Sequence, residues 1–274
     1  TSRHIRERLY RELETNVGLR VESVENADVF KVYGRGEMHL AILIENMRRE
    51  GFELQVSQPK VVMREENGKT HEPFESLVIN VPEDMSGKVI EALSPRKSEM
   101  LSMNTENGHT LMEFEIPTRG LLGFRAVFII LTRGEGTMYH SFERFAPHKG
   151  AIEKRSVGSI ISGESGICTA YALWNLQERG PLFIHPATEV YEGMIIGEHN
   201  KGTDLAVNPI KGKKLTNVRA SGSDDAIRLI PPLEMTLEKA LEYIQDDEYV
   251  EVTPATIRLR KKYLTEVERK RKSK

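Results

Sequence analysis

Two stretches of this sequence follow one plan, and their spacing constrains the fold more than any other feature. The first runs from Gly34 to Gly51 and the second from Arg119 to Gly136. Each opens on an arginine–glycine pair, continues as one apolar-faced helix and stops at a glycine. The two pairs lie 84 positions apart, which is the size of one small α+β domain. A repeated module with no catalytic cluster beside it predicts an arm that docks on something large.

The first module belongs to a predicted ferredoxin-like domain over residues 1–71. Ile5, Leu9 and Leu13 recur at helical spacing, so we expect a helix from Ser2 to Glu14. The pattern that follows predicts two short strands, a helix closed by a glycine and a third strand, in order 17–24, 29–33, 34–51 and 52–56. The order α-β-β-α-β is that of a split βαβ domain without its first strand. We therefore expect a strand, and with it a longer parent chain, upstream of Thr1.

The second module belongs to a predicted complete ferredoxin-like domain over residues 72–150. The polar stretch 65–71 before it is typical of a linker. We expect a helix capped by Ser86 and ended by Pro95, and a hairpin turning at Asn107-Gly108. The other predicted elements are strands at 74–81, 100–103, 109–116 and 137–142 and a helix at 120–131.

Residues 151–274 have a different texture and predict a mainly β domain with a helix near its end. Thr236 is the expected N-cap of that helix. Trp174 falls in an apolar run that predicts a strand, and we expect it in the core. The predicted strands are 159–161, 167–174, 189–196, 206–210, 249–252 and 256–259, followed by a basic tail. The chain as a whole is therefore expected to be an α+β protein.

The sequence indicates neither an enzyme nor a cofactor or metal site. Gly68-Lys69-Thr70 imitates the end of a phosphate-binding loop, but Met63 stands where the leading glycine is needed. The eight histidines show no metal-binding spacing, and the lone Cys168 lies in an apolar run typical of a buried structural residue. A single cysteine suits a reducing cytoplasm. The longest apolar run, 126–131, is far shorter than a membrane span.

Positive charge gathers locally although the formal net charge is −2. Cations, glycines and polar donors share one stretch without an acid, a combination that suits phosphate, ribose and base contacts in RNA. The alternative interpretation is a long solvated loop. The predicted RNA-binding residues are Lys211, Lys213, Lys214, Thr216, Asn217, Arg219, Ser221 and Ser223.

A second set of cations has weaker support. Two of them lie near glycines at helix starts, where phosphate binds well, and the rest belong to the basic end of the chain. The alternatives are domain-interface salt bridges for the first pair and a disordered, solubilising tail for the rest. The secondary candidates are Arg119, Arg125, Arg258, Arg260, Lys261 and Lys262.

Four blocks carry a resemblance to a known family. Residues 32–40 and 116–125 resemble domains III and V of translational GTPases such as elongation factor G and LepA. Residues 213–222 and 231–242 are similar to the BipA/TypA family in particular. The resemblance covers essentially the whole chain, but the GTP-binding domain and the β-barrel domain II have no counterpart in it. GTP and Mg²⁺ would therefore belong to the missing part of the parent.

The resemblance implies a ribosome-binding arm. In this family the C-terminal domain is implied to contact large-subunit rRNA and the tRNA acceptor end at the A-site region, and residues 211–224 match the reaching loop. Ribosomal proteins are further partners that it allows. The parent is implied to act in stress and cold adaptation, virulence regulation and large-subunit assembly. We expect a cytoplasmic monomer with no membrane contact.

Two other classes of function stay open at this point. One is a metabolite-sensing regulatory protein with a ligand between its two ferredoxin-like domains. The other is an oligomerisation scaffold. Neither explains the cationic stretch.

Overall fold

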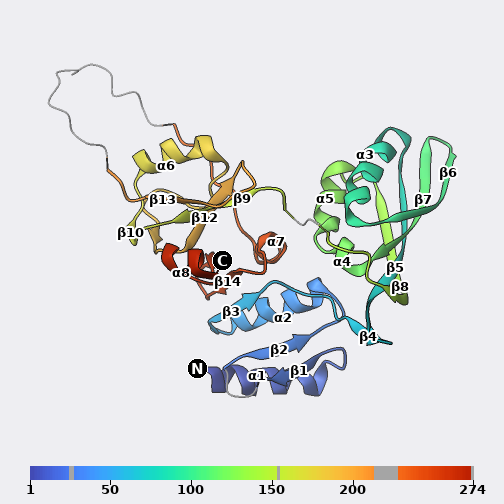
Figure 1. Cartoon of the computed structure of the whole chain (residues 1–274), viewed down its shortest axis with the longest axis horizontal. Helices are drawn as coiled ribbons and strands as arrows, with labels where there is room; N and C mark the ends of the chain where they lie inside the picture. The colour runs from blue at the N-terminus through green and yellow to red at the C-terminus, as the bar shows by residue number, and fades with distance from the viewer. Residues whose placement is uncertain (25–27, 153–154, 213–227, 273–274) are drawn as a thin grey trace. The chain divides into compact units, whose positions relative to one another are not determined.

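The computed structural model describes residues 1–24, 28–152, 155–212 and 228–272 (Figure 1). The chain forms two compact units: unit 1 contains Thr1–Gln58 and Arg155–Lys274, and unit 2 contains Pro59–Lys154. The predicted domain limits at 71 and 150 stay a prediction, because compact units and family domains need not coincide. None of the helices in the described ranges has the length and apolar character that a membrane span requires.

The N-terminal part of unit 1 has the predicted order of elements. It comprises α1 (Ser2–Thr15), β1 (Arg20–Ser23), β2 (Phe30–Tyr33), α2 (Glu37–Arg49) and β3 (Leu54–Ser57). Strands β1 and β2 pair antiparallel, and α1 and α2 bury Leu9, Leu43 and Met47 in one small core. This part is the predicted split βαβ pattern that starts at its first helix.

A six-stranded sheet unites the two chain segments of unit 1. Its order is β13-β9-β12-β15-β14-β3, with β9 (Gly158–Ser162), β12 (Met194–His199), β13 (Leu205–Val207), β14 (Glu248–Val252) and β15 (Ile257–Lys261). Strand β3 pairs antiparallel with β14, so Val56 lies opposite Val250. Helix α7 (Leu237–Tyr243) begins at the predicted N-cap Thr236, whose Oγ1 accepts from the Lys239 N–H at 3.4 Å. Its apolar face packs with Ala41 and Ile195 in the core of this sheet.

The prediction of a strand over 167–174 is wrong. Only β10 (Gly166–Ile167) is extended, and it pairs with β11 (Glu189–Val190). The rest is helix α6 (Ala170–Leu176), which continues into the 3-10 turn η2 (Gln177–Arg179). Thr169 caps α6, since its Oγ1 accepts from the Ala172 N–H at 3.1 Å. Periodicity cannot tell a helix from a strand in an apolar run this short. Here the N-cap hydrogen bond of Thr169 favours the helix. A last helix, α8 (Glu266–Lys272), carries the basic end.

Unit 2 is the complete ferredoxin-like domain that the sequence predicts. Strands β4 (Arg64–Glu66), β5 (Lys69–Pro82), β7 (His109–Pro117) and β6 (Glu99–Glu106) form a sheet in that order, and β8 (Thr137–Pro147) pairs with β5. The helical segments are α3 (Glu83–Leu93), η1 (Ser94–Arg96), α4 (Thr118–Leu121) and α5 (Phe124–Leu131). Leu77 and Phe114 are cross-strand partners on the face where α3 and α5 pack.

Turn residues explain where unit 2 departs from expectation. The stretch 65–71 is no linker but a hairpin, in which Asn67 (φ 54°) and Gly68 (φ 71°) join β4 to β5. The predicted hairpin turn at Asn107 (φ 53°) and Gly108 (φ 76°) is confirmed. Both have the left-handed conformations of a type I′ turn, which Asn-Gly favours.

The predictions for two helices in unit 2 are also wrong in their limits. Helix α3 begins at Glu83, and Ser86 lies inside it, donating to the Glu83 carbonyl at 2.7 Å instead of capping. The predicted helix 120–131 is two helices, separated at Gly123 (φ 68°).

Candidate nucleic-acid interface

Lys211 is the one predicted primary RNA contact that lies within the described residues, where its side chain is exposed. The others lie outside the described ranges: Lys213, Lys214, Thr216, Asn217, Arg219, Ser221 and Ser223. The described chain nevertheless defines how both borders of this stretch are held.

Thr169, the N-cap residue of α6, holds the chain on the N-terminal side of residues 213–227. Thr169 Oγ1 donates to the Lys211 carbonyl at 2.7 Å, and the Thr169 N–H donates to the Pro209 carbonyl at 3.0 Å. Pro209 is buried. The same hydroxyl therefore caps α6 and anchors the chain beside Lys211.

The C-terminal border is fixed by one amide side chain at the other end of α6. Gln177 Nε2 donates to the Arg228 carbonyl at 3.2 Å, and its Oε1 accepts from the Ile230 N–H at 3.0 Å. Sequence reasoning missed Gln177, because its role depends on a contact with a chain segment more than 50 residues away. Thr169 and Gln177 together hold the chain on both sides of 213–227.

Among the secondary candidates, Arg119 is committed to an ion pair. Its Nε and Nη2 both bind the carboxylate of Glu72, and Nη2 also donates to the Gly150 carbonyl. The side chains are 12% exposed for Arg119 and 1% for Glu72. Arg119 therefore braces the interior of unit 2, which argues against its predicted contact with RNA.

The environment of Glu72 favours its charged form. Burial alone would raise the pKa of Glu72, but Arg119 and the Lys149 N–H, which donates at 2.7 Å, outweigh it and hold the pKa below its ordinary value. A depressed carboxyl pKa adds stability above the unfolded-state pKa, and that stability is lost as pH falls through the folded-state value.

The lowered pKa of Glu72 predicts how stability depends on pH. As pH falls from 5 to 3, the unfolding free energy of the wild type should drop more steeply than that of Glu72→Gln. Urea unfolding followed by circular dichroism at several pH values measures the two slopes. Glu135→Gln, at an exposed position, should track the wild type. Equal slopes for Glu72→Gln and the wild type would contradict the assignment.

The candidates on and after β15 divide into buried and exposed side chains. Arg260 pairs with Glu251 at 3.3 Å and is 16% exposed, and Arg258 is half-buried. Lys262 is exposed. Arg125 is exposed too, on α5 of unit 2. Lys262 and Arg125 therefore have the side chains most open to a polyanion.

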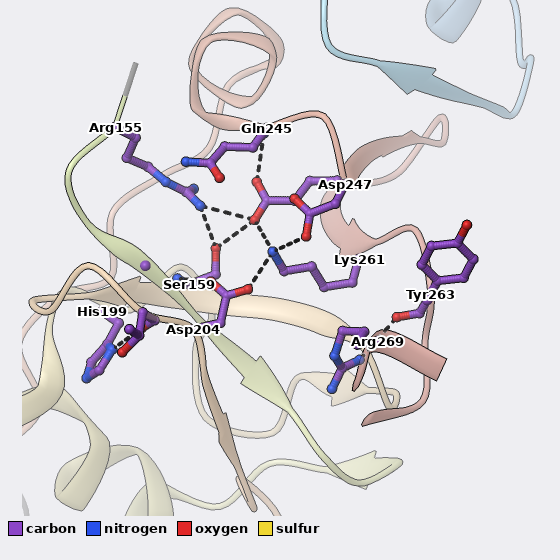
Figure 2. Close-up of polar contacts among 12 residues, drawn as sticks. Arg155, Ser159, His199, Asp204, Gln245, Asp247, Lys261, Tyr263 and Arg269 are labelled. Atoms are coloured by element: carbon purple, nitrogen blue, oxygen red, sulfur yellow. Dashed lines mark hydrogen bonds and ion pairs between the residues drawn. The ribbon is translucent and has the colours of Figure 1, made fainter. Parts of the chain in front are cut away.

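Lys261 is buried, which corrects its place among the RNA contacts. Its side chain is 2% exposed, and Nζ lies 2.8 Å from Glu248, 2.6 Å from Asp204 and 2.9 Å from Asp247 (Figure 2). Burial alone would lower the pKa of Lys261, but the carboxylates of Glu248 and Asp204 outweigh it and raise the pKa. A lysine held this way cannot reach a phosphate.

Glu248 is the centre of this ion network. Its side chain is fully buried, and Oε1 also accepts from Arg155 Nη2 at 3.1 Å and from Ser159 Oγ at 2.9 Å (Figure 2). Its other oxygen accepts from the Gln245 N–H at 2.9 Å. Two cations and two neutral donors thus satisfy one buried carboxylate.

The end of α7 lies next to the network. Arg155 Nη1 donates to the Tyr243 carbonyl at 3.3 Å, and the buried Gln58 donates to the Ile244 carbonyl at 2.5 Å. The Arg155 guanidinium lies 4.1 Å from the centre of the Tyr243 ring, and burial raises the pKa of Tyr243 to about 12. Gln58 and Arg155 are the residues at which the chain leaves and re-enters unit 1.

Metal-binding and thiol chemistry can also be assessed among the described residues. In the described part of the chain, no three His, Cys, Asp or Glu side chains gather in a group that could hold a metal ion. Cys168 is buried as predicted, and burial raises the pKa of its thiol.

Comparisons with known proteins match two consecutive segments of the chain. Residues 157–266 match the TypA/BipA C-terminal domain, and residues 69–156 match the elongation factor G C-terminus. The chain is 52% identical over 273 residues to the large ribosomal subunit assembly factor BipA of Escherichia coli K12, covering 99% of this chain and 45% of that protein. It is 56% identical over 262 residues to the protein of that name from Synechocystis, covering 95% and 44%. The Haemophilus influenzae protein is 54% identical over 273 residues, covering 99% and 44%. The chain thus spans less than half the length of these relatives.

Proposed function

The chain belongs to the TypA/BipA family, and from this premise we propose that it is the ribosome-binding arm of a translational GTPase that acts in large-subunit assembly. The observation that carries the proposal is the identity above 50% to proteins named large ribosomal subunit assembly factor, along nearly the entire chain. The arm binds; GTP hydrolysis, with GTP and Mg²⁺, belongs to the part of such a protein that this chain does not match. Its place of action is the cytoplasm, where ribosomes assemble.

We further propose that residues 211–223 supply the main RNA contact. Lys211 is exposed beside the anchored cap of α6, and three more cations follow within eight positions. Cations on glycine-bearing chain neutralise phosphates, and the hydroxyl and amide groups among them reach ribose and base edges. The partners would be large-subunit rRNA and the acceptor end of A-site tRNA, with ribosomal proteins nearby. Stress adaptation and virulence regulation would follow from this action on ribosomes.

Replacing Lys211, Lys213, Lys214 and Arg219 by alanine tests the proposal. Each lost phosphate contact reduces the slope of log affinity against log salt by about 0.7–0.9, so the slope should fall by roughly 3. Affinity for large ribosomal subunits at 0.1 M salt should drop on the order of 10²- to 10³-fold. Co-sedimentation with purified subunits across a salt series measures both quantities.

A matched control removes the same charge elsewhere. Lys31, Lys69, Lys88 and Lys201 are exposed, and their joint replacement by alanine should leave affinity within about threefold of the wild type. Equal binding by wild type and the first variant, with a shallow salt dependence, would overturn the proposed contact. Ribosome binding that is absent in the wild type, together with a thermal shift on adding an amino acid, would favour the metabolite-sensing alternative.

A further inference from the structure

Helix α6 presents the sole tryptophan of the chain to solvent. Trp174 is 44% exposed, although the sequence pattern predicts it in the core. It lies between Thr169 and Gln177, the two residues that hold the chain on either side of 213–227. Trp174 and Gln177 are three positions apart, so they share one face of the helix. An indole exposed to this degree is a large rigid contact surface that the described residues leave partly uncovered.

Positive charge lies at both ends of this helix. Lys211 is exposed where its carbonyl meets Thr169, at the N-terminal end. Arg228 is exposed where its carbonyl meets Gln177, and Arg179 is exposed two positions beyond. Glu178 is the acid among them. From Thr169 to Gln177 the chain rises about 12 Å, so the backbone at Lys211 and the backbone at Arg228 are held at opposite ends of the helix that carries the indole.

The chemistry of this face fits a ligand that is both flat and anionic. An unpaired nucleotide has a π-face for the indole and phosphates for the flanking cations. A nucleobase inside a duplex has its faces covered by its neighbours and cannot use Trp174. A peptide of Asp and Glu alone meets the charge requirement but has no aromatic face to stack.

We propose that Trp174 stacks on an unpaired nucleobase of RNA, with Lys211 and Arg228 on the adjoining phosphates. The proposal rests on the proposed RNA-binding function and specifies which form of RNA α6 recognises. Thr169 and Gln177 are the positioning residues, because they set where the two cations lie relative to the indole.

Tryptophan fluorescence, excited selectively over the tyrosines, tests the stack directly, because Trp174 is the single tryptophan of the sequence. Titration with a single-stranded RNA oligonucleotide of about ten nucleotides should quench the emission and shield the indole from iodide. A blunt RNA duplex of the same length should bind through its phosphates with little change in emission. Base–aromatic stacking is worth about 1–3 kcal/mol per base, so Trp174→Ala should weaken single-strand binding by about 5- to 150-fold at an unchanged salt slope.

The controls separate stacking from folding and from charge. Trp174→Phe keeps a smaller aromatic face and should retain most of the affinity. Tyr10→Ala removes an aromatic that is 47% exposed on α1 and should have no effect. Gln177→Ala should weaken single-strand binding while leaving the circular dichroism spectrum intact.

The outcomes distinguish this proposal from the one it rests on. If labelled single-stranded RNA binds by anisotropy while Trp174 emission and iodide access stay unchanged, stacking is wrong and RNA binding stands. If the wild type binds neither RNA nor ribosomal subunits, the proposed function fails. If a polyglutamate peptide shields Trp174 as well as RNA does, the site recognises an acidic protein segment and the nucleobase assignment is overturned.

Discussion

Replacing Glu248 by alanine is expected to lower the unfolding free energy of unit 1 by about 3 kcal/mol. The substitution removes the shared partner of Arg155 and Lys261, whose side chains are 9% and 2% exposed. Both cations would then be buried without that carboxylate, and Ser159 Oγ would keep only the Tyr243 hydroxyl, at 3.2 Å, as a possible acceptor. Urea unfolding followed by Trp174 emission reports on unit 1, because that residue is the only tryptophan.

A second variant makes this prediction specific to the ion network. Glu248→Leu combined with Lys261→Met and Arg155→Leu removes the carboxylate and both of its cations together, and it should recover a large part of the lost stability, because well-packed apolar residues often replace buried ion pairs without loss. Glu53→Ala, at an exposed glutamate in the same unit, should change stability by less than about 0.5 kcal/mol. A Glu248→Ala protein as stable as the Glu53→Ala protein would show that the network contributes nothing.

Replacing Arg119 by alanine is expected to destabilise unit 2 by about 3–5 kcal/mol. The carboxylate of Glu72, whose side chain is 1% exposed, would keep the Lys149 N–H and lose its charged partner. Hydrogen exchange of β5 and β7 peptides, read by mass spectrometry, measures the loss in unit 2 separately from unit 1. Arg119→Leu with Glu72→Leu should recover stability, since no lone charge remains buried.

The same variant separates two interpretations of this arginine. Because Arg119 is committed to Glu72, its replacement should leave the salt slope of ribosome binding unchanged wherever unit 2 stays folded. Lys88→Ala is the matched control, since this exposed lysine on α3 lies in the same unit and is not a proposed RNA contact. A reduced salt slope with normal exchange protection for Arg119→Ala would restore the sequence-based hypothesis of phosphate contact.

Local signals in the sequence were sufficient to predict most of unit 2. Alternating apolar residues predict β5 and β7, and Asn107-Gly108 predicts the hairpin turn, because these signals act within a few residues. Asn67-Gly68 is the same turn signal, but the polar residues around it suggested a linker. The strand over 167–174 failed for a related reason: Thr169 ends one element and caps the next.

Long-range pairing is what sequence patterns could not reveal. Nothing near Leu54 shows that β3 pairs with β14, almost 200 residues away. In the same way a basic run predicts Lys261 and Lys262 equally, yet they alternate along the chain, so that one is buried and the other exposed. The carboxylates that pair with Lys261 come from two different parts of the sequence: Asp204 from one, and Asp247 and Glu248 from the other. Charge clustering therefore found the candidate region but could not separate binding cations from structural ones.

The two consecutive carbonyls at the end of α7 have a mechanical consequence. Gln58 and Arg155 fasten both chain passages to the peptide groups of Tyr243 and Ile244. Both borders of unit 1 are therefore held at one turn of helix, beside the buried charges of Glu248 and Lys261. Unfolding of that single turn would release Gln58 and Arg155 together.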